Sequence, residues 1–402
     1  MWKLALRNVF RHKTRTALTL AAIAFGVVSL VVSGGFVEDF FIQLREATIH
    51  SQFGHLQLYR SGYYEMGKRS PYRYMINDPD ETMARLHKIE HVVDITPRVN
   101  FSGLLSNSRA TVPIIGEGVD PDGELKLSTY ITMTAGNNLT QDTRYAIILG
   151  QGLADALNLK IGDNATILLN TREGALNSLD FEVVGTFQTF SKEYDDRAVR
   201  IPLAVAQELI DTRAVHSLVL ALDETSHTNE VAQRVSALLP GDQFEIKTWY
   251  ELADFYQKAV DLYRRYFVVL RLIILGMVLL GVANSVNMTI YERTGEFGTL
   301  MALGNRRQLI LRLVLAENLL VGLLGSGAGV LLGVLIALAI STIGIPMPPM
   351  PNTNSGYMAT VRLVPNEIEM GFLIGLFATC LATLLPAWRA SRLSVVDALA
   401  RN

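Results

Sequence analysis

Four predominantly apolar runs divide the chain, and each is long enough to cross a membrane once. About 20 apolar helical residues span a hydrocarbon core ~30 Å thick. No charged residue lies between Ala17 and Val37, and the second run contains only Arg271. The pattern predicts four transmembrane helices, at residues 16–37, 266–290, 313–343 and 370–388.

Lysine and arginine are distributed unevenly around these runs. Basic residues mark the cytoplasmic flanks of membrane spans. They gather before the first run, between the second and third runs and after the fourth, whereas the loop between the third and fourth has only Arg362. We therefore expect both termini, the loop 291–312 and the tail 389–402 to be cytoplasmic. Residues 38–265 and the proline-rich loop 344–369 are then periplasmic.

Residues 1–15 have apolar positions at helical spacing, with basic residues elsewhere around the helix. Such a pattern is typical of an amphipathic helix that lies on a membrane surface. The alternative is an ordinary positively charged flank. The apolar positions are Trp2, Ala5, Leu6, Val9 and Phe10.

Residues 38–265 change to short alternating runs and helical segments that are separated by turn residues. Strands are predicted at residues 55–59, 92–99, 112–115, 147–149, 165–169, 181–187, 216–222 and 244–248. Helices are predicted at residues 79–89, 153–159, 205–210 and 229–239. This irregular order favours an α+β domain with a mixed sheet, arranged in two lobes. The predicted fold class is an α-helical integral membrane protein with a large α+β domain inserted between the first two spans.

The third run is dense in glycine, with small-xxx-small spacing. Because lipid gives helices no hydrophobic drive to associate, small residues permit the close approach that holds membrane helices together. We expect this face to pack against another span or a second subunit. Its residues are Gly325, Gly329 and Gly333.

Two charged residues lie within the runs, Arg271 in the second and Glu317 in the third. Both lie near helix ends, where long charged side chains reach the membrane surface. We expect this arrangement for both, in preference to an intramembrane ion pair.

Composition narrows the function classes. Half of the residues are hydrophobic (50%), 18% are charged and the net charge is −2, so the chain has no overall basic field for nucleic acid. Its one cysteine, Cys380, lies in an apolar run and excludes an intramolecular disulfide. The sequence has no P-loop, dinucleotide fingerprint or nucleophile–base pattern. We therefore predict no catalytic, cofactor or metal residue, and no ATPase site of its own.

Two local groups suggest metal chemistry at first sight. His87 and His91 are four residues apart on the predicted helix 79–89 and its end, but no third ligand accompanies them, so a solvated pair is favoured. The cluster from Glu193 to Asp196 is interpreted as a turn in preference to a cation site.

The stretch YERTGEFGTLMALGNRRQLILRLVLAENLLVGLLGSGAG, which starts at Tyr291, resembles the signature of FtsX/MacB-type permeases. The tail LLPAWRASRLSVVDALARN resembles the family's ending, although Trp388 stands where a basic residue is usual and Val395 where proline is common. The opening LALRNVFRHKTRTALTLAAIAFGV and the outer run IILGQGLADALNLKIGDNATILL also fit. The resemblance implies a type VII ABC transporter permease, with two ATPase subunits and a second permease copy or paralogue as partners.

The segment from Glu292 to Gly304 is a candidate ATPase-coupling helix. It begins with charged residues and continues with an apolar face, so that it is suited to entering a groove on a partner. The alternative is a solvated connector. The residues expected to couple are Glu292, Arg293, Glu296, Phe297, Leu300 and Met301.

Within the superfamily, the run FEVVGTFQTFSKEYDDRAVRIPLAVAQELI most resembles lipoprotein-releasing (Lol-type) permeases. This resemblance implies a bacterial inner-membrane subunit that contacts lipids and extracts lipoproteins or other amphiphiles, with a lipoprotein cargo or chaperone outside. ATP and Mg²⁺ would bind the partner ATPase. The alternative function is a non-transporting scaffold that transmits motion to a periplasmic partner such as a cell-wall hydrolase.

Overall fold

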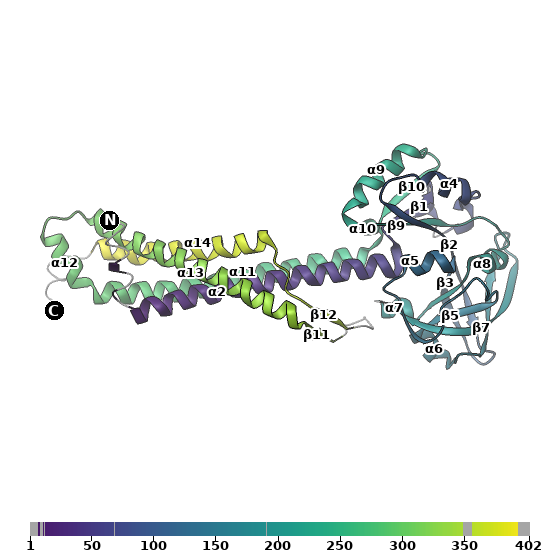
Figure 1. The fold of residues 1–402 in the computed structure, drawn as a ribbon, viewed down its shortest axis with the longest axis horizontal. Coiled ribbons are helices and arrows are strands. Elements are labelled where there is room, and N and C mark those ends of the chain that lie inside the picture. The colour runs from purple at the N-terminus through teal and green to yellow at the C-terminus, as the bar shows by residue number, and fades with distance from the viewer. Residues whose placement is uncertain are drawn as a thin grey trace. The chain divides into compact units, whose positions relative to one another are not determined.

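The computed structural model describes residues 7–8, 11, 13–67, 69–189, 191–348 and 356–392. The chain divides into two compact units (Figure 1). The membrane unit comprises the described parts of Met1–Ile42, Val260–Pro346 and Met358–Asn402, and the outer domain comprises those of Gln43–Ala259 and Met347–Tyr357. The amphipathic helix predicted at residues 1–15 and the tail 389–402 lie largely outside the described residues.

The membrane unit is built on long helices. Among the described residues, four of them are long and apolar enough to span a membrane. They are α2 (Lys13–Thr48), α11 (Asp254–Glu292), α13 (Arg307–Ile343) and α14 (Pro365–Ser391), and the short α12 (Thr294–Ala302) lies between α11 and α13. The helices α2 and α11 extend beyond the predicted apolar runs. In α2, Glu38 and Asp39 end the hydrophobic run without breaking the helix. A short pair of strands, β11 (Ile345–Met347) and β12 (Tyr357–Ala359), precedes α14.

The small-residue face of α13 packs against α2 within the same chain. A Cβ atom added to any of the three predicted glycines would lie 2.7–3.1 Å from an α2 side chain. The pairs are Gly325 with Ile23, Gly329 with Val27, and Gly333 with Val31. The α2 residues follow one another at intervals of four, so they form one helical ridge over the glycine face.

The charged residues inside the spans do not behave as predicted. Arg271 of α11 forms an ion pair with Glu367 of α14. Glu317 is buried at 6% exposure and pairs with Arg293. The expected extension of Glu317 to the membrane surface is therefore wrong, because a nearby guanidinium compensates its charge inside the unit. The pair of Arg271 and Glu367 is part-buried and connects two helices.

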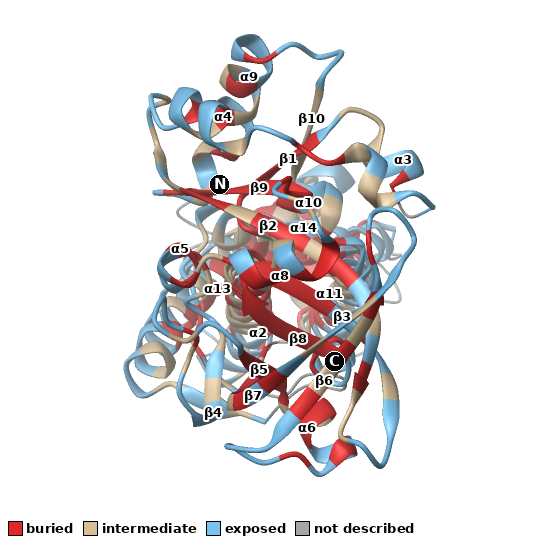
Figure 2. Cartoon of the chain, turned by 90° about the vertical axis from the view of Figure 1, so that its right-hand side faces the viewer, coloured by how far each residue is buried: buried red, intermediate tan, exposed pale blue. Residues whose placement is uncertain are grey.

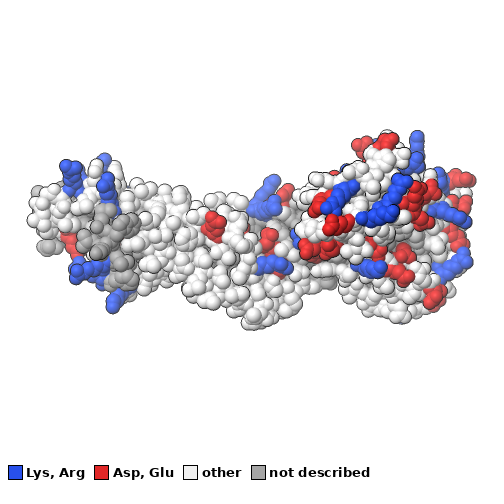
Figure 3. Space-filling model, turned by 45° about the horizontal axis from the view of Figure 1, so that its top comes forward, with Lys and Arg blue, Asp and Glu red and all other residues white. Residues whose placement is uncertain are grey.

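The surface of the membrane unit carries few charged side chains over most of its visible length (Figure 3). Figure 3 shows white residues along the helices, with Lys and Arg gathered at the end that carries α12. Large apolar side chains on this surface are typical of contact with lipid or another membrane helix. They include Leu272, Met277, Leu280, Leu335 and Phe377.

The outer domain contains one ten-stranded mixed sheet, in the order β10-β1-β9-β2-β3-β8-β5-β7-β4, with β6 pairing β2 and β7. The pairs β3–β8 and β5–β7 are parallel. The strands are β1 (Leu56–Arg60), β2 (Val92–Ser106), β3 (Thr111–Val119), β4 (Thr132–Gly136), β5 (Ala146–Gly150), β6 (Asn164–Asn170), β7 (Leu176–Gln188), β8 (Ala198–Pro202), β9 (Ser217–Leu222) and β10 (Phe244–Thr248). The mixed α+β architecture agrees with the sequence prediction.

Strand β2 joins the two parts of the domain. Its first half pairs with β9, and its second half pairs with β3 and β6. The two lobes predicted from the sequence therefore share one sheet and one compact unit. The helices around this sheet are η1 (Ile49–Phe53), α3 (Tyr63–Met66), η2 (Pro71–Tyr74), α4 (Pro79–Leu86), α5 (Pro121–Leu127), α6 (Gln151–Leu157), α7 (Lys192–Asp195), α8 (Leu203–Ile210), η3 (Thr225–His227), α9 (Thr228–Leu238) and α10 (Trp249–Leu252).

A continuous aliphatic core holds the outer domain. Figure 2 shows the buried residues concentrated along the strands, while the surrounding helices expose one face. Strand β9 is buried at every position, and α8 buries four residues at helical spacing, as an amphipathic helix on a sheet requires. The α8 residues are Val205, Ala206, Leu209 and Ile210.

Candidate functional site

The helix α12 is held between two long helices by short, well-defined connections. Arg293 separates α11 from α12, and Gly304 follows α12 with a φ of 87°. Glycine adopts this left-handed conformation without steric cost, so it allows the chain to reverse before α13. Asn305 strengthens the turn, since its backbone amide and its side chain both donate to the carbonyl of Leu300.

The apolar face of α12 points into the membrane unit. Phe297 is 0% exposed and belongs to the same core cluster as Val286 and Ile310, while Leu300 and Met301 pack against that cluster. The prediction that Phe297 enters a groove on a partner is therefore wrong, because its own chain already covers it. Truncating Phe297 would disrupt the core of this unit instead of removing a contact with a partner.

The opposite face of α12 is open. Thr299, Ala302 and Leu303 are exposed, and Leu303 has 76% of its surface accessible. An apolar side chain exposed to this extent is available for contact with a partner. The surface of this helix that remains available to a partner thus differs from the one predicted from the sequence.

Arg293 is the centre of a charged cluster. Its Nε donates to Oε2 of Glu296 at 3.0 Å, and its Nη1 donates to Oε2 of Glu317 at 2.6 Å. Its guanidinium carbon lies 5.1 Å from the ring centre of Phe297. Glu317 also accepts a hydrogen bond from Nδ2 of Asn8 at 2.6 Å. A buried guanidinium with two carboxylates and an aromatic face fixes α12 against α13.

Two arginines near the start of the chain complete the cluster. Arg11 donates to Glu296 at 2.9 Å, and Arg15 pairs with both carboxylate oxygens of Glu292. Partial burial would raise the pKa of Glu296, but the hydrogen bonds and charges of Arg293 and Arg11 outweigh burial and lower it. The charges predicted to sit at a partner's rim are therefore already paired within the chain. The spacing of four between Arg11 and Arg15 was the sequence signal that these side chains share a helix face.

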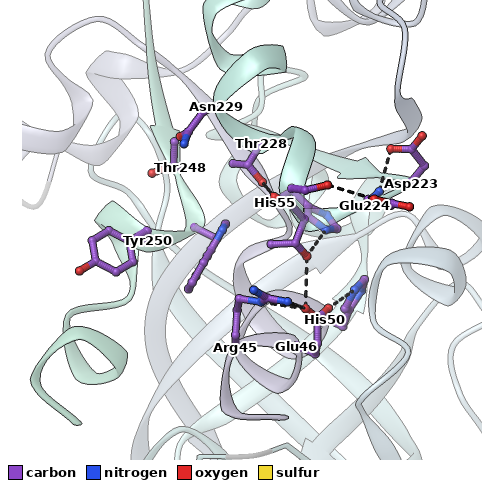
Figure 4. A pocket seen from close by; sticks show the side chains of 13 residues that line it. Arg45, Glu46, His50, His55, Asp223, Glu224, Thr228, Asn229, Thr248 and Tyr250 are labelled. Carbon is purple, nitrogen blue, oxygen red and sulfur yellow. Dashed lines mark hydrogen bonds and ion pairs between the residues drawn. The ribbon is translucent and has the colours of Figure 1, made fainter. Parts of the chain in front are cut away.

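The outer domain contains a polar cavity of about 710 Å³ (Figure 4). Glu46 lies at its base, where it pairs with Arg45 at 2.8 Å and with His50 at 3.5 Å. His55 is buried and accepts a hydrogen bond from the backbone amide of Leu222 through Nδ1. Burial, assisted by the charge of His50, lowers the pKa of His55 to about 4. The cavity wall is therefore rich in imidazole and carboxylate groups.

The structure places the two groups that suggested metal chemistry in short turns of the outer domain. Helix α4 ends at Leu86, so His87 caps it and His91 lies beyond it in a turn. The two histidines therefore share no helical face. In the second group, Asp195 is the last residue of the one-turn helix α7 and is fully buried. Its carboxylate accepts hydrogen bonds from the backbone amide and the side-chain hydroxyl of Thr189. This carboxylate has a structural role.

Comparison with known families gives two adjoining matches. Residues 16–238 match the model of the MacB-like periplasmic core domain, and residues 268–395 match that of the FtsX-like permease C-terminal domain. The first match alone covers more than half of the chain. The chain belongs to the FtsX/MacB-type ABC permeases. The resemblance in the stretch that starts at Tyr291 is thereby confirmed.

Named relatives of this permease family fall into two groups. The chain is 22% identical to the lipoprotein-releasing system transmembrane protein LolE of Haemophilus influenzae, over 79% of this chain and 80% of the relative. It is 23% identical to LolC of Neisseria meningitidis serogroup B, over 96% and 93% of the two chains. It is 24% identical to the macrolide export ATP-binding/permease protein MacB of a Shewanella species, over 100% of this chain and 60% of the relative.

These relatives and the four apolar helices indicate a multi-pass inner-membrane ABC permease with a periplasmic domain that associates with an ABC ATPase. The match to the periplasmic core model covers most of α2 and the outer domain as far as the end of α9. The part that matches the FtsX-like model contains α12 and the cluster around Arg293.

Proposed function

We propose that this permease couples ATP hydrolysis in a separate ATPase subunit to release of lipoproteins or other amphiphiles from the inner membrane, with α12 as the coupling helix. The observation that supports the proposal is that α12 has one buried face and one exposed face. One face is locked into the membrane unit by Phe297 and Arg293, and the other exposes Leu303. A partner bound to the exposed face would therefore move the helix together with the spans that flank it.

The locking contacts explain why motion would be transmitted. Arg293 connects α12 to Glu317 of α13, and Arg15 connects Glu292 to α2. Packed cores and charged clusters resist gradual deformation, so a displacement at one side moves the connected helices together. ATP and Mg²⁺ would remain in the partner, and both termini together with α12 would be cytoplasmic. The lysine and arginine asymmetry of the sequence supports this orientation.

The relatives support the class of cargo. Two of them are named for lipoprotein release, and together they match this chain over most of its length. The relative named for macrolide export is also named for ATP binding, and the match with this chain covers 60% of that relative's length. A lipoprotein combines a polar body with acyl chains, so its release requires work at the membrane surface, where a moving outer domain would act.

The first test replaces Leu303 by glutamate. If the exposed end of α12 docks on the ATPase, a buried leucine contributes about 1.5–3 kcal/mol, so affinity for the purified ATPase should fall at least roughly tenfold. Stimulated ATP hydrolysis should fall with it. The matched control is Leu238→Glu, an exposed leucine of the outer domain, which should leave both unchanged.

The second readout identifies the work performed. In proteoliposomes that contain the permease, the ATPase and an acylated lipoprotein, ATP should release the lipoprotein, and Leu303→Glu should reduce the release. Equal ATPase binding by Leu303→Glu and the parent chain would remove α12 as the docking element. ATPase binding without lipoprotein release, together with activation of an added cell-wall hydrolase, would favour the scaffold function instead.

A further inference from the structure

Three side chains from separate segments of the outer domain converge on one point. His91 lies in the turn between α4 and β2, Asp223 follows β9, and His227 ends η3. Nδ1 of His91 lies 2.8 Å from Oδ2 of Asp223, and Nδ1 of His227 lies 2.8 Å from Oδ1 of the same carboxylate. One potential ligand atom from each residue lies within 4.8 Å of the other two.

The backbone holds the segments in this arrangement. His91 has a φ of 71°, a left-handed conformation that is uncommon for any residue with a side chain. The amide of Asp223 donates to the carbonyl of His91 at 3.2 Å, and the amide of Glu224 donates to Oδ1 of Asp223 at 2.7 Å. The first bond connects the start of β2 to the end of β9, and the second orients the carboxylate, so the two imidazoles face it from defined positions.

The two imidazole rings stack, with ring centres 3.7 Å apart and an angle of 26° between their planes. The stack therefore brings one nitrogen of each imidazole to the same carboxylate. Neutral imidazole is the form that binds metal ions. A carboxylate between two imidazoles adds a charged oxygen ligand to two nitrogen ligands.

We propose that His91, Asp223 and His227 bind one divalent transition-metal ion of the zinc type, with water completing the coordination. Two imidazoles and one carboxylate with an open fourth position form an established ligand combination for zinc. In a tetrahedral zinc site, neighbouring ligand atoms lie about 3.3 Å apart. The 2.8 Å contacts between nitrogen and oxygen are therefore consistent with protons in the place of the metal, and a small outward movement of the rings would admit the ion.

The site would connect parts of the outer domain that are distant in sequence. Asp223 also lines the polar cavity that contains Glu46 and His50, and Figure 4 shows it with its neighbour Glu224 at the edge of that cavity. A bound ion would fasten β2, β9 and η3 at one side of the cavity. This metal site is independent of the coupling proposed for α12, because no residue is shared between them.

The test measures binding of zinc to the full-length permease, purified in detergent without a histidine tag. Calorimetric titration with Zn²⁺ alone should show one ion per chain. Because loss of an outer-shell partner typically weakens metal binding 10–100-fold, loss of a direct ligand in His91→Ala or His227→Ala should weaken it at least ~100-fold. His87→Ala changes an exposed histidine at the end of α4, outside the proposed site, and this variant should bind zinc like the parent chain.

Two further measurements make the outcome decisive. Co²⁺ in place of zinc should give the visible absorption of a four-coordinate site in the parent chain and lose it in His227→Ala. Asp223→Asn preserves the side-chain shape. This variant is the one to be measured if the histidine variants have a lower melting temperature than the parent chain without metal. Absence of saturable zinc binding, or full binding by both His227→Ala and Asp223→Asn, would overturn the proposal. Loss of binding in His50→Gln alone would also overturn it, by moving the site into the cavity.

Discussion

The membrane unit and the outer domain use opposite means to bring their helices and strands together. In the membrane unit, glycines of α13 allow the ridge of Ile23, Val27 and Val31 to approach the helix backbone. In the outer domain, a continuous core of aliphatic side chains fills the space between sheet and helices. Water drives apolar burial in the second case, whereas lipid offers no such drive and leaves close packing to hold the helices.

Buried charge also differs between the two units. The membrane unit confines its charged cluster around Arg293 to one end, where Arg11 and Glu296 are partly exposed. The outer domain buries four charges in its interior, where the guanidiniums of Arg98 and Arg200 share the carboxylate of Glu124, and Arg200 also pairs with Glu117.

The buried charges of the outer domain fix one particular segment. Arg98 donates to the carbonyl of Gln52, and Arg200 donates to that of Ser51, so both guanidiniums hold the π-helical turn η1 that directly follows α2. Aliphatic contacts alone specify position less strictly than directed hydrogen bonds do. This domain therefore combines a core that tolerates substitution with directed hydrogen bonds that fix the segment leading into it.

The largest expected effect comes from breaking that attachment. Glu124→Gln removes the carboxylate charge between Arg98 and Arg200, both 3% exposed at the side chain, and leaves them incompletely compensated. Loss of one partner from a buried ion pair costs about 3–5 kcal/mol. The free energy of unfolding of the outer domain, measured by denaturant titration of the full chain, should fall by this amount.

The control for Glu124→Gln is an exposed pair in the same domain. Arg144 and Glu208 form an ion pair with side chains 71% and 41% exposed. Glu208→Gln should change stability by less than ~1 kcal/mol, since exposed pairs contribute little. Similar stability losses in Glu124→Gln and Glu208→Gln would show that a buried ion pair contributes no more than an exposed one. The buried charges would then not be what fixes η1.

Much of this organisation was predictable from the sequence, because apolar run length and glycine spacing are local properties. The four long helices, the α+β domain and the glycine face follow from them. Strand β8 escaped prediction because Arg200 reads as a surface residue, although the fold buries it among carboxylates. Helix α5 and strand β4 also escaped prediction, as each is short and mixed in polarity.

The sites were less predictable, because they depend on which residues meet in space. Periodicity places Phe297, Leu300 and Met301 on one face of α12, but it does not tell whether a partner or the same chain covers that face. His91 and Asp223 are 132 positions apart, so local spacing paired His91 with His87 instead. Long-range pairing of strands β2 and β9 is what brings the true neighbours together.

A second effect should appear in the outer domain when pH falls. His216 is fully buried, its Nδ1 accepts from the amide of Asn100 at 3.1 Å, and burial lowers its pKa to about 4. The usual pKa of a histidine side chain is 6.5, so the unfolded chain binds the proton more tightly than the folded chain does. Stability is then complete above about pH 6.5 and falls as pH decreases towards 4, by roughly 2 kcal/mol at pH 5.

The variant His216→Gln isolates this contribution. Glutamine does not titrate and its side-chain oxygen can accept from Asn100, so the loss of stability between pH 7.5 and pH 5 should be smaller by roughly 2 kcal/mol than in the parent chain. His87→Gln changes an exposed histidine and should leave the pH dependence unaltered. If His216→Gln and the parent chain lose equal stability on acidification, His216 does not carry the acid sensitivity.

The smallest expected effect tests the close contact of the membrane unit with a single methyl group. A Cβ at Gly329 would lie 2.7 Å from Cβ of Val27 and 2.9 Å from the carbonyl oxygen of Ala24, so either helix must move. Overpacking of this kind costs about 1–3 kcal/mol, part of which the better helix propensity of alanine offsets. Gly327, two positions away, has open space around its Cβ position. Gly329→Ala should therefore lower the melting temperature of the purified permease, Gly329→Leu should lower it further, and Gly327→Ala should leave it unchanged or raise it. Equal melting temperatures for the two alanine variants would mean that the glycine face is not what holds α13 to α2.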